Sequence, residues 1–203
     1  ANHNEDSFRE LIARHLDLVY SAAIRQTRDA HLAEEAAQSV FIELSRSAAR
    51  IRPDLPVTAW LYTVTRRKAI DLIRRENARA TREQLPATDA ALIADSSAPF
   101  SPAPLASETS ATWSRLAGEL DDAMTALGEK DRTALLLRFF ANRPLRDIGA
   151  QLNISEDAAQ KRIARALDRL RGHFSRRGFA IGSTTLASAL STHAVHTPPL
   201  ALA

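Results

Sequence analysis

The side chains that could do chemistry in this 203-residue chain are basic, and they gather in two short segments. Residues 66–82 carry seven Lys and Arg against two acidic residues, and residues 161–177 carry seven against one. Lysine and arginine at this density are suited to phosphates and to the edges of bases. Acidic residues outnumber basic ones in the sequence before each segment. Residues 1–45 contain eight acidic and four basic residues, and residues 116–160 contain eight acidic and five basic residues. We interpret the two basic segments as two nucleic-acid contacts on one chain.

Other chemistries find little support in the sequence. The chain has no Cys, which excludes a disulfide scaffold, a thiol nucleophile and a Cys-ligated metal. Its six His are scattered, and its acidic residues form no cluster that would hold two metals on one face, as a nuclease requires. We therefore expect no enzyme, no cofactor and no metal. With no signal peptide and no apolar run of about 18 residues, we also expect a cytoplasmic protein without membrane insertion.

The composition indicates the elements that position these basic residues. Ala, Leu, Arg and Glu are abundant while only 6 Gly are present, which predicts an all-α fold. Residues 1–80 and 114–178 have helical periodicity and predict two small domains. The first should contain three to four helices and the second four. Residues 81–113 hold four of the 9 prolines and predict a flexible linker. Residues 179–203 form a tail without any charged side chain.

Local signals predict the helix ends of both domains. Ser7 and Glu10 form a capping-box pattern that predicts the start of a first helix. A second helix is expected after Asp29, and a third from about Thr58 to Arg79. In the second domain, Pro144 suits the first turn of a helix that ends at Asn153, a residue that tolerates the left-handed conformation. Ser155 can cap the next helix, so the segment predicts a helix-turn-helix.

The last helix of the second domain should read duplex DNA. Its apolar residues 159, 163, 166, 167 and 170 cluster within about 80° at 100° per residue and must face the core. Short side chains at the start of the opposite side let the backbone approach DNA, and longer basic ones further along reach bases or phosphates. The alternative is a solvated basic face. The predicted duplex contacts are Ser155, Asp157, Ala158, Lys161, Arg162 and Arg165.

The third helix of the first domain combines an aromatic residue with a basic track. Such a surface suits single-stranded nucleic acid, because a ring can stack on an unpaired base while arginines bind phosphates. The predicted contacts are Trp60, Thr63, Arg67, Arg74 and Arg75. Trp60 is equally well explained as a half-buried packing residue.

The uncharged tail predicts one short helix. Ser183 could cap a helix that runs to about Ala194 and places Leu186 and Leu190 one turn apart. Our hypothesis is that this leucine stripe docks on a hydrophobic groove, within this protein or on a regulator. A disordered terminus is the alternative.

Three segments together resemble the small, extracytoplasmic-function (ECF) sigma factors of bacterial RNA polymerase. Residues 33–44 are similar to the polymerase-binding helix of that family, residues 58–75 to its promoter-melting and −10-reading helix, and residues 145–167 to its −35-reading helix-turn-helix. The resemblance covers roughly 7–82 and 116–174. It implies contacts to polymerase by Glu34, Glu35, Gln38 and Phe41.

The resemblance implies a sigma factor that binds RNA polymerase core, through its β′ and β subunits, and directs promoter recognition, melting and initiation. The first domain would capture the melted non-template strand at −10 and the second the duplex at −35. A linker of about 33 residues can extend to about 110 Å, enough for sites about 70 Å apart. An anti-sigma factor is a further partner that the resemblance allows. The alternative is a helix-turn-helix regulator that acts on duplex DNA without polymerase core.

Overall fold

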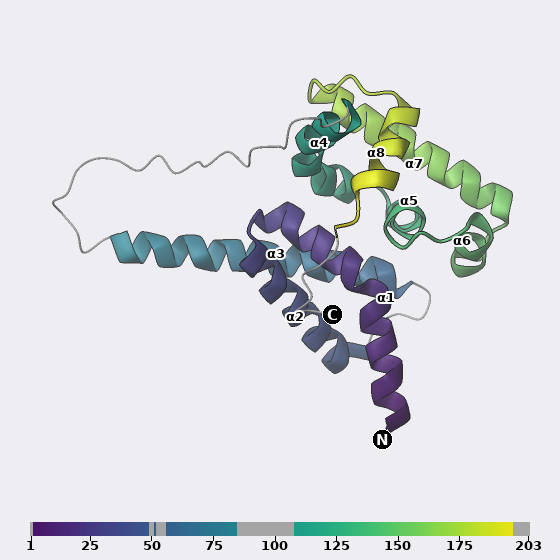
Figure 1. Ribbon diagram of the computed structural model, residues 1–203. Helices are drawn as coiled ribbons and strands as arrows, with labels where there is room; N and C mark the ends of the chain where they lie inside the picture. The colour runs from purple at the N-terminus through teal and green to yellow at the C-terminus, as the bar shows by residue number, and fades with distance from the viewer. Residues whose placement is uncertain (1, 49–50, 52–55, 85–107, 197–203) are drawn as a thin grey trace.

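The computed structural model describes residues 2–48, 51, 56–84 and 108–196, and every regular element within them is helical (Figure 1). The predicted all-α fold is therefore confirmed. In chain order the elements are α1 (Asn2–Thr27), α2 (Ala30–Ser47), α3 (Val57–Gln84), α4 (Glu108–Thr125), α5 (Glu129–Leu135), the π-helix η2 (Leu136–Phe140), α6 (Leu145–Leu152), α7 (Glu156–Arg176) and α8 (Ser183–His193).

The helices α1–α3 form a first unit in which each helix packs on the other two. α2 begins after Asp29 as predicted, and Oδ1 of Asp29 caps it by accepting a hydrogen bond from the Leu32 amide at 2.8 Å. Ala36 and Ala37 of α2 are fully buried. Their small side chains let the backbone of α2 lie close to its neighbours in the bundle.

Two helix ends differ from the prediction. The capping box is wrong: α1 begins at Asn2, so Ser7 and Glu10 lie inside it on an exposed face. Residues 2–6 contain no Gly or Pro, and Glu5 in the first turn favours the positive end of the helix dipole. At its other end α3 continues beyond Arg79 and ends two residues before Pro86 in the sequence. The segment expected as a linker, 81–113, thus contributes helical turns at both ends, and its residues 85–107 lie outside the described structure.

The second unit, α4–α8, contains the helix-turn-helix. α6 ends at Asn153, whose φ of 53° and ψ of 48° are left-handed, as the sequence predicted. Oγ of Ser155 then accepts a hydrogen bond from the Ala158 amide at 3.2 Å and caps α7. Before this motif, α5 widens directly into the π-helix η2, where the Ala141 amide donates to the Leu136 carbonyl at 3.0 Å.

The tail forms a helix over the predicted range, α8, which packs on α4 and α7 of the same chain. The predicted cap is wrong: Gly182 is the N-cap, and Ser183 is the first helical residue, whose hydroxyl bonds Asp168 instead. Leu186 and Leu190 are fully buried there, each worth about 1.5–3 kcal/mol of hydrophobic stabilisation. The rings of Trp113 and His193 stack with their centroids 6.0 Å apart. The leucine stripe thus docks within this protein, which was one of the two sites that the sequence left open.

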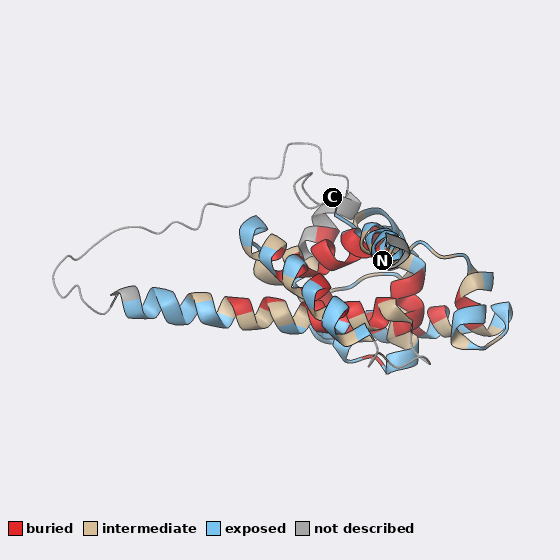
Figure 2. Cartoon of the chain, turned by 90° about the horizontal axis from the view of Figure 1, so that it is seen from below, coloured by how far each residue is buried: buried red, intermediate tan, exposed pale blue. Residues whose placement is uncertain are grey.

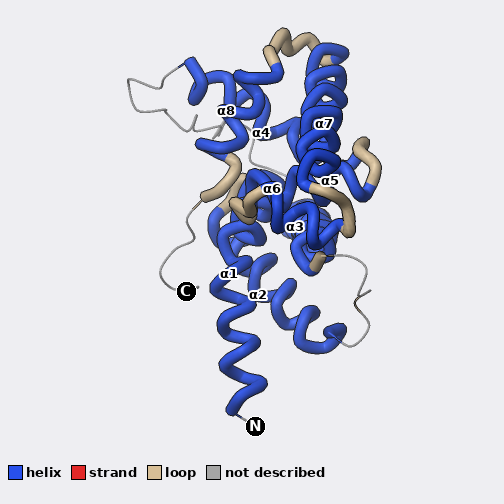
Figure 3. Tube along the Cα trace, turned by 90° about the vertical axis from the view of Figure 1, so that its right-hand side faces the viewer, coloured by secondary structure: helices blue, strands red, loops and turns tan. Residues whose placement is uncertain are grey.

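The two units lie against each other, with α4 beside α1 and with α5 and η2 beside α3 (Figures 1 and 3). Buried residues continue from one unit into the other, whereas the far half of α3 projects into solvent (Figure 2). His15 of α1 lies near this contact, and its Nδ1 is buried without a hydrogen-bond partner among the described residues. Burial, then the charges of Arg14 and Arg143, lower the pKa of His15 to about 4.

Candidate nucleic-acid interface

The outer face of α7 presents most of the predicted duplex contacts. Its inner face is buried at residues 159, 163, 166, 170 and 174. Asp157, Lys161 and Arg165 are exposed on the other side, and Ala158 is half-buried. Nε of Arg165 donates to the Lys161 carbonyl at 3.2 Å, which lays the side chain along the helix. Ser155 is exposed at the N-terminus of α7. The fold therefore brings these five residues onto one accessible surface.

Arg162 has a different environment from the other five. Its Nη1 lies 2.9 Å from Oδ1 of Asp131 on α5, and its side chain is only 25% exposed. The second carboxylate oxygen of Asp131 pairs with Arg169 at 2.6 Å. One carboxylate thus joins α5 to α7 through two arginines. The structure gives Arg162 a role in holding α7 against α5, which the helical periodicity did not reveal.

The predicted single-strand contacts lie along α3. Trp60 is half-buried and packs against the core, as the packing alternative foresaw. Thr63 is exposed, and its hydroxyl donates to the Ala59 carbonyl at 3.0 Å. Arg74 and Arg75 are exposed and form no ion pair with the residues that the structure describes.

An acidic residue of α2 lies beside this basic track. Glu43 pairs with both Arg67 and Lys68 of α3. The hydrogen bond from Lys68, followed by the hydrogen bond and charge of Arg67, lowers the pKa of Glu43 despite its partial burial. Arg67 is therefore already neutralised in part and can reach a phosphate only by sharing or leaving this carboxylate.

A cavity of about 390 Å³ opens beside the basic face of α3. Thr63, Arg67 and Arg74 line it from α3, and Thr125 and Arg132 line it from the second unit. A cavity of this size is typical of binding sites for small ligands or single groups of a larger one. It brings three of the predicted single-strand contacts together. Trp60 and Arg75 are outside its lining.

Arg66 belongs to this face although the sequence analysis did not select it. It lines the cavity, and its Nη2 lies 2.7 Å from Oδ1 of Asp122 on α4. Nε of Arg66 is buried without a hydrogen-bond partner among the described residues. Its place in the basic run 66–68 was the available signal, but the partner on α4 lies 56 residues away in the sequence.

The third predicted site, on α2, is accompanied by an apolar groove. Glu35 and Gln38 are exposed and Glu34 is half-buried, whereas Phe41 is only 8% exposed and belongs to the core. Ile42 is 51% exposed, the most exposed of the large hydrophobic residues described. The groove has a volume of about 380 Å³ and is lined by Phe8, Ile12, Leu16, Gln38, Phe41, Ile42 and Ser45.

Ile42, Phe8 and Ile12 were missing from the predicted site on α2. A signal for Ile42 was present, because it falls outside the four-residue repeat of apolar positions that α2 turns toward the core. Phe8 and Ile12 instead fit the apolar stripe of α1 and gave no sign of partial exposure.

None of the described helices is both long enough and apolar enough to cross a membrane.

Comparison with known proteins gives two family matches in the same order as the two units. Residues 11–79 match Sigma-70 region 2, and residues 117–170 match Sigma-70, region 4. The chain is 32% identical over 170 residues to RNA polymerase sigma factor CarQ of Myxococcus xanthus, covering 82% of this chain and 88% of that protein. It is 29% identical to ECF RNA polymerase sigma factor SigE of Mycolicibacterium smegmatis, covering 84% of this chain and 62% of that protein. Among solved structures, the sigma factor RpoE in complex with the anti-sigma factor NepR from Bartonella quintana aligns with a TM-score of 0.38 and 16% identity, covering 83% of this chain and 97% of that one.

Proposed function

The chain belongs to the ECF group of the sigma-70 family, and we propose that it binds RNA polymerase core and directs it to promoters. The observation that carries this proposal is the order of the two family matches, each of which includes most of one basic helix. A regulator that binds only duplex DNA would need the second match and not the first. The action is one of binding and melting without covalent chemistry, and we place it in the cytoplasm, with an anti-sigma factor as a further partner.

The second unit is proposed to dock α7 in the major groove of the −35 duplex. The N-terminal half of a recognition helix contacts base edges in this motif. Lys161 and Arg165 are exposed in that half and long enough to reach bases or phosphates. Ser155, Asp157 and Ala158 precede them with shorter side chains, which allow the backbone to approach. Arg162 supports the motif from the flank and contributes to DNA binding indirectly, through its ion pair with α5.

The first unit is proposed to bind the melted non-template strand at −10 along α3. Thr63, Arg67 and Arg74 around the cavity, with Arg75 beyond it, supply donors and positive charge for a single strand. Trp60 is half-buried, which leaves part of its indole for stacking on an unpaired base. Contacts of this kind offset the few kcal/mol that unstacking a base costs.

The polymerase is proposed to bind α2 and the groove beside it. Glu34 and Glu35 lie in an acidic segment that phosphates would repel, so they suit a basic protein surface better than DNA. Gln38 and Ile42 line or border the apolar groove and would supply the desolvated centre of the contact. Phe41 shapes the groove from the core side.

Transcription by bacterial core polymerase on a pool of upstream-region fragments tests the proposal. Specific transcripts should appear only when the purified chain is added. A Lys161→Ala/Arg165→Ala double variant should lose them while still binding core, and a Glu34→Lys/Glu35→Lys double variant should lose core binding while retaining affinity for duplex DNA. Absence of transcripts together with tight, sequence-specific binding to duplex DNA would instead identify a regulator that acts without polymerase.

A further inference from the structure

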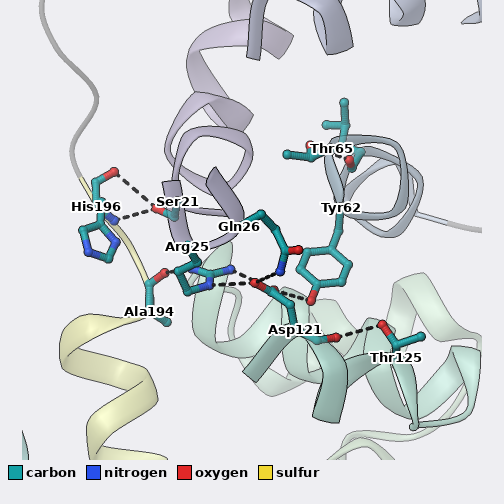
Figure 4. A network of polar contacts seen from close by, with 10 residues as sticks. Ser21, Arg25, Gln26, Tyr62, Thr65, Asp121, Thr125, Ala194 and His196 are labelled. Atoms are coloured by element: carbon teal, nitrogen blue, oxygen red, sulfur yellow. Dashed lines mark hydrogen bonds and ion pairs between the residues drawn. The ribbon is translucent and has the colours of Figure 1, made fainter. Parts of the chain in front are cut away.

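One arginine of the first unit makes three of the hydrogen bonds between the two units. The Arg25 side chain, on α1, is 2% exposed. Its Nε and Nη2 each lie 3.4 Å from an oxygen of Asp121 on α4, and its Nη1 donates to the Ala194 carbonyl, just after α8, at 2.9 Å (Figure 4). Its guanidinium carbon also lies 5.1 Å from the centre of the Phe140 ring. All of these partners belong to the second unit.

The carboxylate of Asp121 depends on the first unit in return. It is 1% exposed, and besides Arg25 it accepts hydrogen bonds from the Tyr62 hydroxyl at 2.6 Å and from Nε2 of Gln26 at 2.9 Å (Figure 4). Burial, and then the negative charge of Asp121, raise the pKa of Tyr62 well above its usual range, so its hydroxyl remains a donor. A buried carboxylate needs such donors, and water would replace them if the units separated.

The tail is attached to both units. At one end the leucines of α8 are buried on the second unit, and Oγ of Ser183 lies 3.0 Å from Oδ1 of Asp168 on α7. At the other end Oγ of Ser21 on α1 accepts a hydrogen bond from the His196 amide at 2.6 Å and donates to the His196 carbonyl at 3.3 Å (Figure 4). The tail therefore bridges the contact and adds to the energy that holds it closed.

The closed contact covers part of the basic face of α3. Asp122 presents its carboxylate to Arg66 at 2.7 Å, where the phosphate of a bound strand would otherwise lie. Thr125 and Arg132 complete the wall of the adjacent cavity from the second unit. A single strand that enters this cavity and contacts Arg66 must displace the Asp122 carboxylate and move the second unit away.

We propose that residues 183–196 are an intramolecular strap that keeps the two units closed and so restrains binding of single-stranded DNA to α3. The proposal rests on the function proposed above for α3. The sequence between the two units permits opening, because the 23 residues between Gln84 and Glu108 can span roughly 80 Å when extended. Opening exposes Arg66 and frees the second unit to reach a separate duplex site.

Single-molecule energy transfer on the full chain tests the strap. Because the sequence contains no Cys, dyes can be placed through His31→Cys on α2 and Ser175→Cys on α7, both exposed positions outside the proposed binding surfaces. The unaltered tail should give mostly high transfer. Ser21→Ala removes both hydrogen bonds to His196. The open fraction should rise about fivefold, which corresponds to a net loss of about 1 kcal/mol, the contribution of one ordinary hydrogen bond. Deletion of residues 183–203 should raise it further.

Matched variants keep the test decisive. Asp6→Asn breaks an exposed ion pair with Arg9 within α1 and should leave the open fraction unchanged. Asp121→Ala removes the carboxylate that binds Arg25, Gln26 and Tyr62 across the contact and leaves Arg25 without its buried partner, so it should open the units and define the low-transfer signal. If circular dichroism shows that the tail deletion loses more helix than α8 alone, the Ser21→Ala variant, which retains α8, decides whether the tail holds the units closed.

The outcomes separate the strap from the function on which it rests. An open fraction that neither Ser21→Ala nor the deletion changes would overturn the strap. Oligo(dT) should lower transfer in the full chain and bind the deletion variant several-fold more tightly; binding without any change in transfer would overturn the covering of α3. Failure of every variant to bind oligo(dT) or to support transcription would refute the proposed function, while the transfer values would still report on the strap.

Discussion

Replacement of Gly149 by alanine tests the turn that sets the spacing of α6 and α7. Gly149 is buried in α6, and its carbonyl accepts a hydrogen bond from the Ile154 amide at 2.9 Å. A Cβ on Gly149 would lie 2.8 Å from the carbonyl oxygen of Ile154 and 3.3 Å from the carbonyl carbon of Ser155. Both are backbone atoms of the turn. The contact can therefore be relieved only if the two helices move apart.

The magnitude follows from two opposing effects. Forcing a methyl group into a packed site typically costs about 1–3 kcal/mol. Replacing glycine by alanine inside a helix stabilises the folded state by about 1 kcal/mol, because alanine has the higher helix propensity. Gly172→Ala in α7 is the matched control, because the nearest atom to its Cβ is Nη1 of Arg176 at 3.9 Å, an ordinary contact. The propensity gain is common to both variants, so their difference in stability isolates the steric cost, about 1–3 kcal/mol.

Thermal melting followed by circular dichroism measures this difference. A chain of this size changes its midpoint by about 2–4 °C per kcal/mol, so Gly172→Ala should melt roughly 2–12 °C above Gly149→Ala. Gly172→Ala should also melt above the unaltered chain. If the two variants melt together, or if Gly149→Ala melts higher, the close approach at the turn does not constrain α6 and α7, and the reasoning is refuted.

Three further predictions concern the surfaces and one buried histidine. Arg165→Ala should weaken binding to a −35 duplex by about 1–3 kcal/mol in fluorescence anisotropy at fixed salt, whereas Arg162→Ala should mainly lower the melting midpoint by removing its ion pair with α5; equal affinity of Arg165→Ala and the unaltered chain would contradict the assignment. Ile42→Asp should weaken binding to core polymerase roughly tenfold, about 1.4 kcal/mol, while His31→Asp on the same helix should not, and equal losses would argue against the groove. His15 has a pKa of about 4 in the folded chain against 6.5 for the free side chain, so the unfolded state binds more protons between these values and stability should fall by about 2 kcal/mol from pH 7 to pH 5. Urea titrations at the two pH values should show a smaller fall for His15→Gln, and parallel profiles would contradict the assignment.

The sequence predicted those features that are encoded within a few residues. The start of α2 after Asp29, the cap at Ser155 and the left-handed Asn153 each depend on residues next to the helix end. The period of the apolar residues likewise placed the buried face of α7. The capping box at Ser7 failed because an equally helical segment precedes it, so that the motif lies inside α1. A local motif predicts a helix end only where its neighbours do not extend the helix.

The contact between the units could not be predicted in this way. Arg25 and Asp121 are 96 residues apart, and Tyr62 and Asp121 are 59 apart. In the sequence all three are ordinary members of amphipathic helices, and only the packing of α4 on α1 and α3 makes them buried partners. Arg162 is a similar case, since its ion pair with Asp131 depends on how α5 crosses α7. The pairing of charges that are far apart in the sequence depends on how the helices pack. Local sequence patterns do not give this packing, so they cannot predict such pairs.

The alternation of acidic and basic segments has a second meaning in the folded chain. It was interpreted as two basic DNA contacts, yet the acidic stretch of the second unit also supplies Asp121 and Asp122 to basic residues of the first. If α3 binds DNA as proposed, the carboxylate of Asp122 and the phosphates of DNA compete for the basic face of α3. Salt weakens the partly exposed pair of Arg66 with Asp122 more than the buried pair of Arg25 with Asp121. Raising the salt concentration should thus loosen the cover over α3 before it separates the units, and it should weaken DNA binding at the same time.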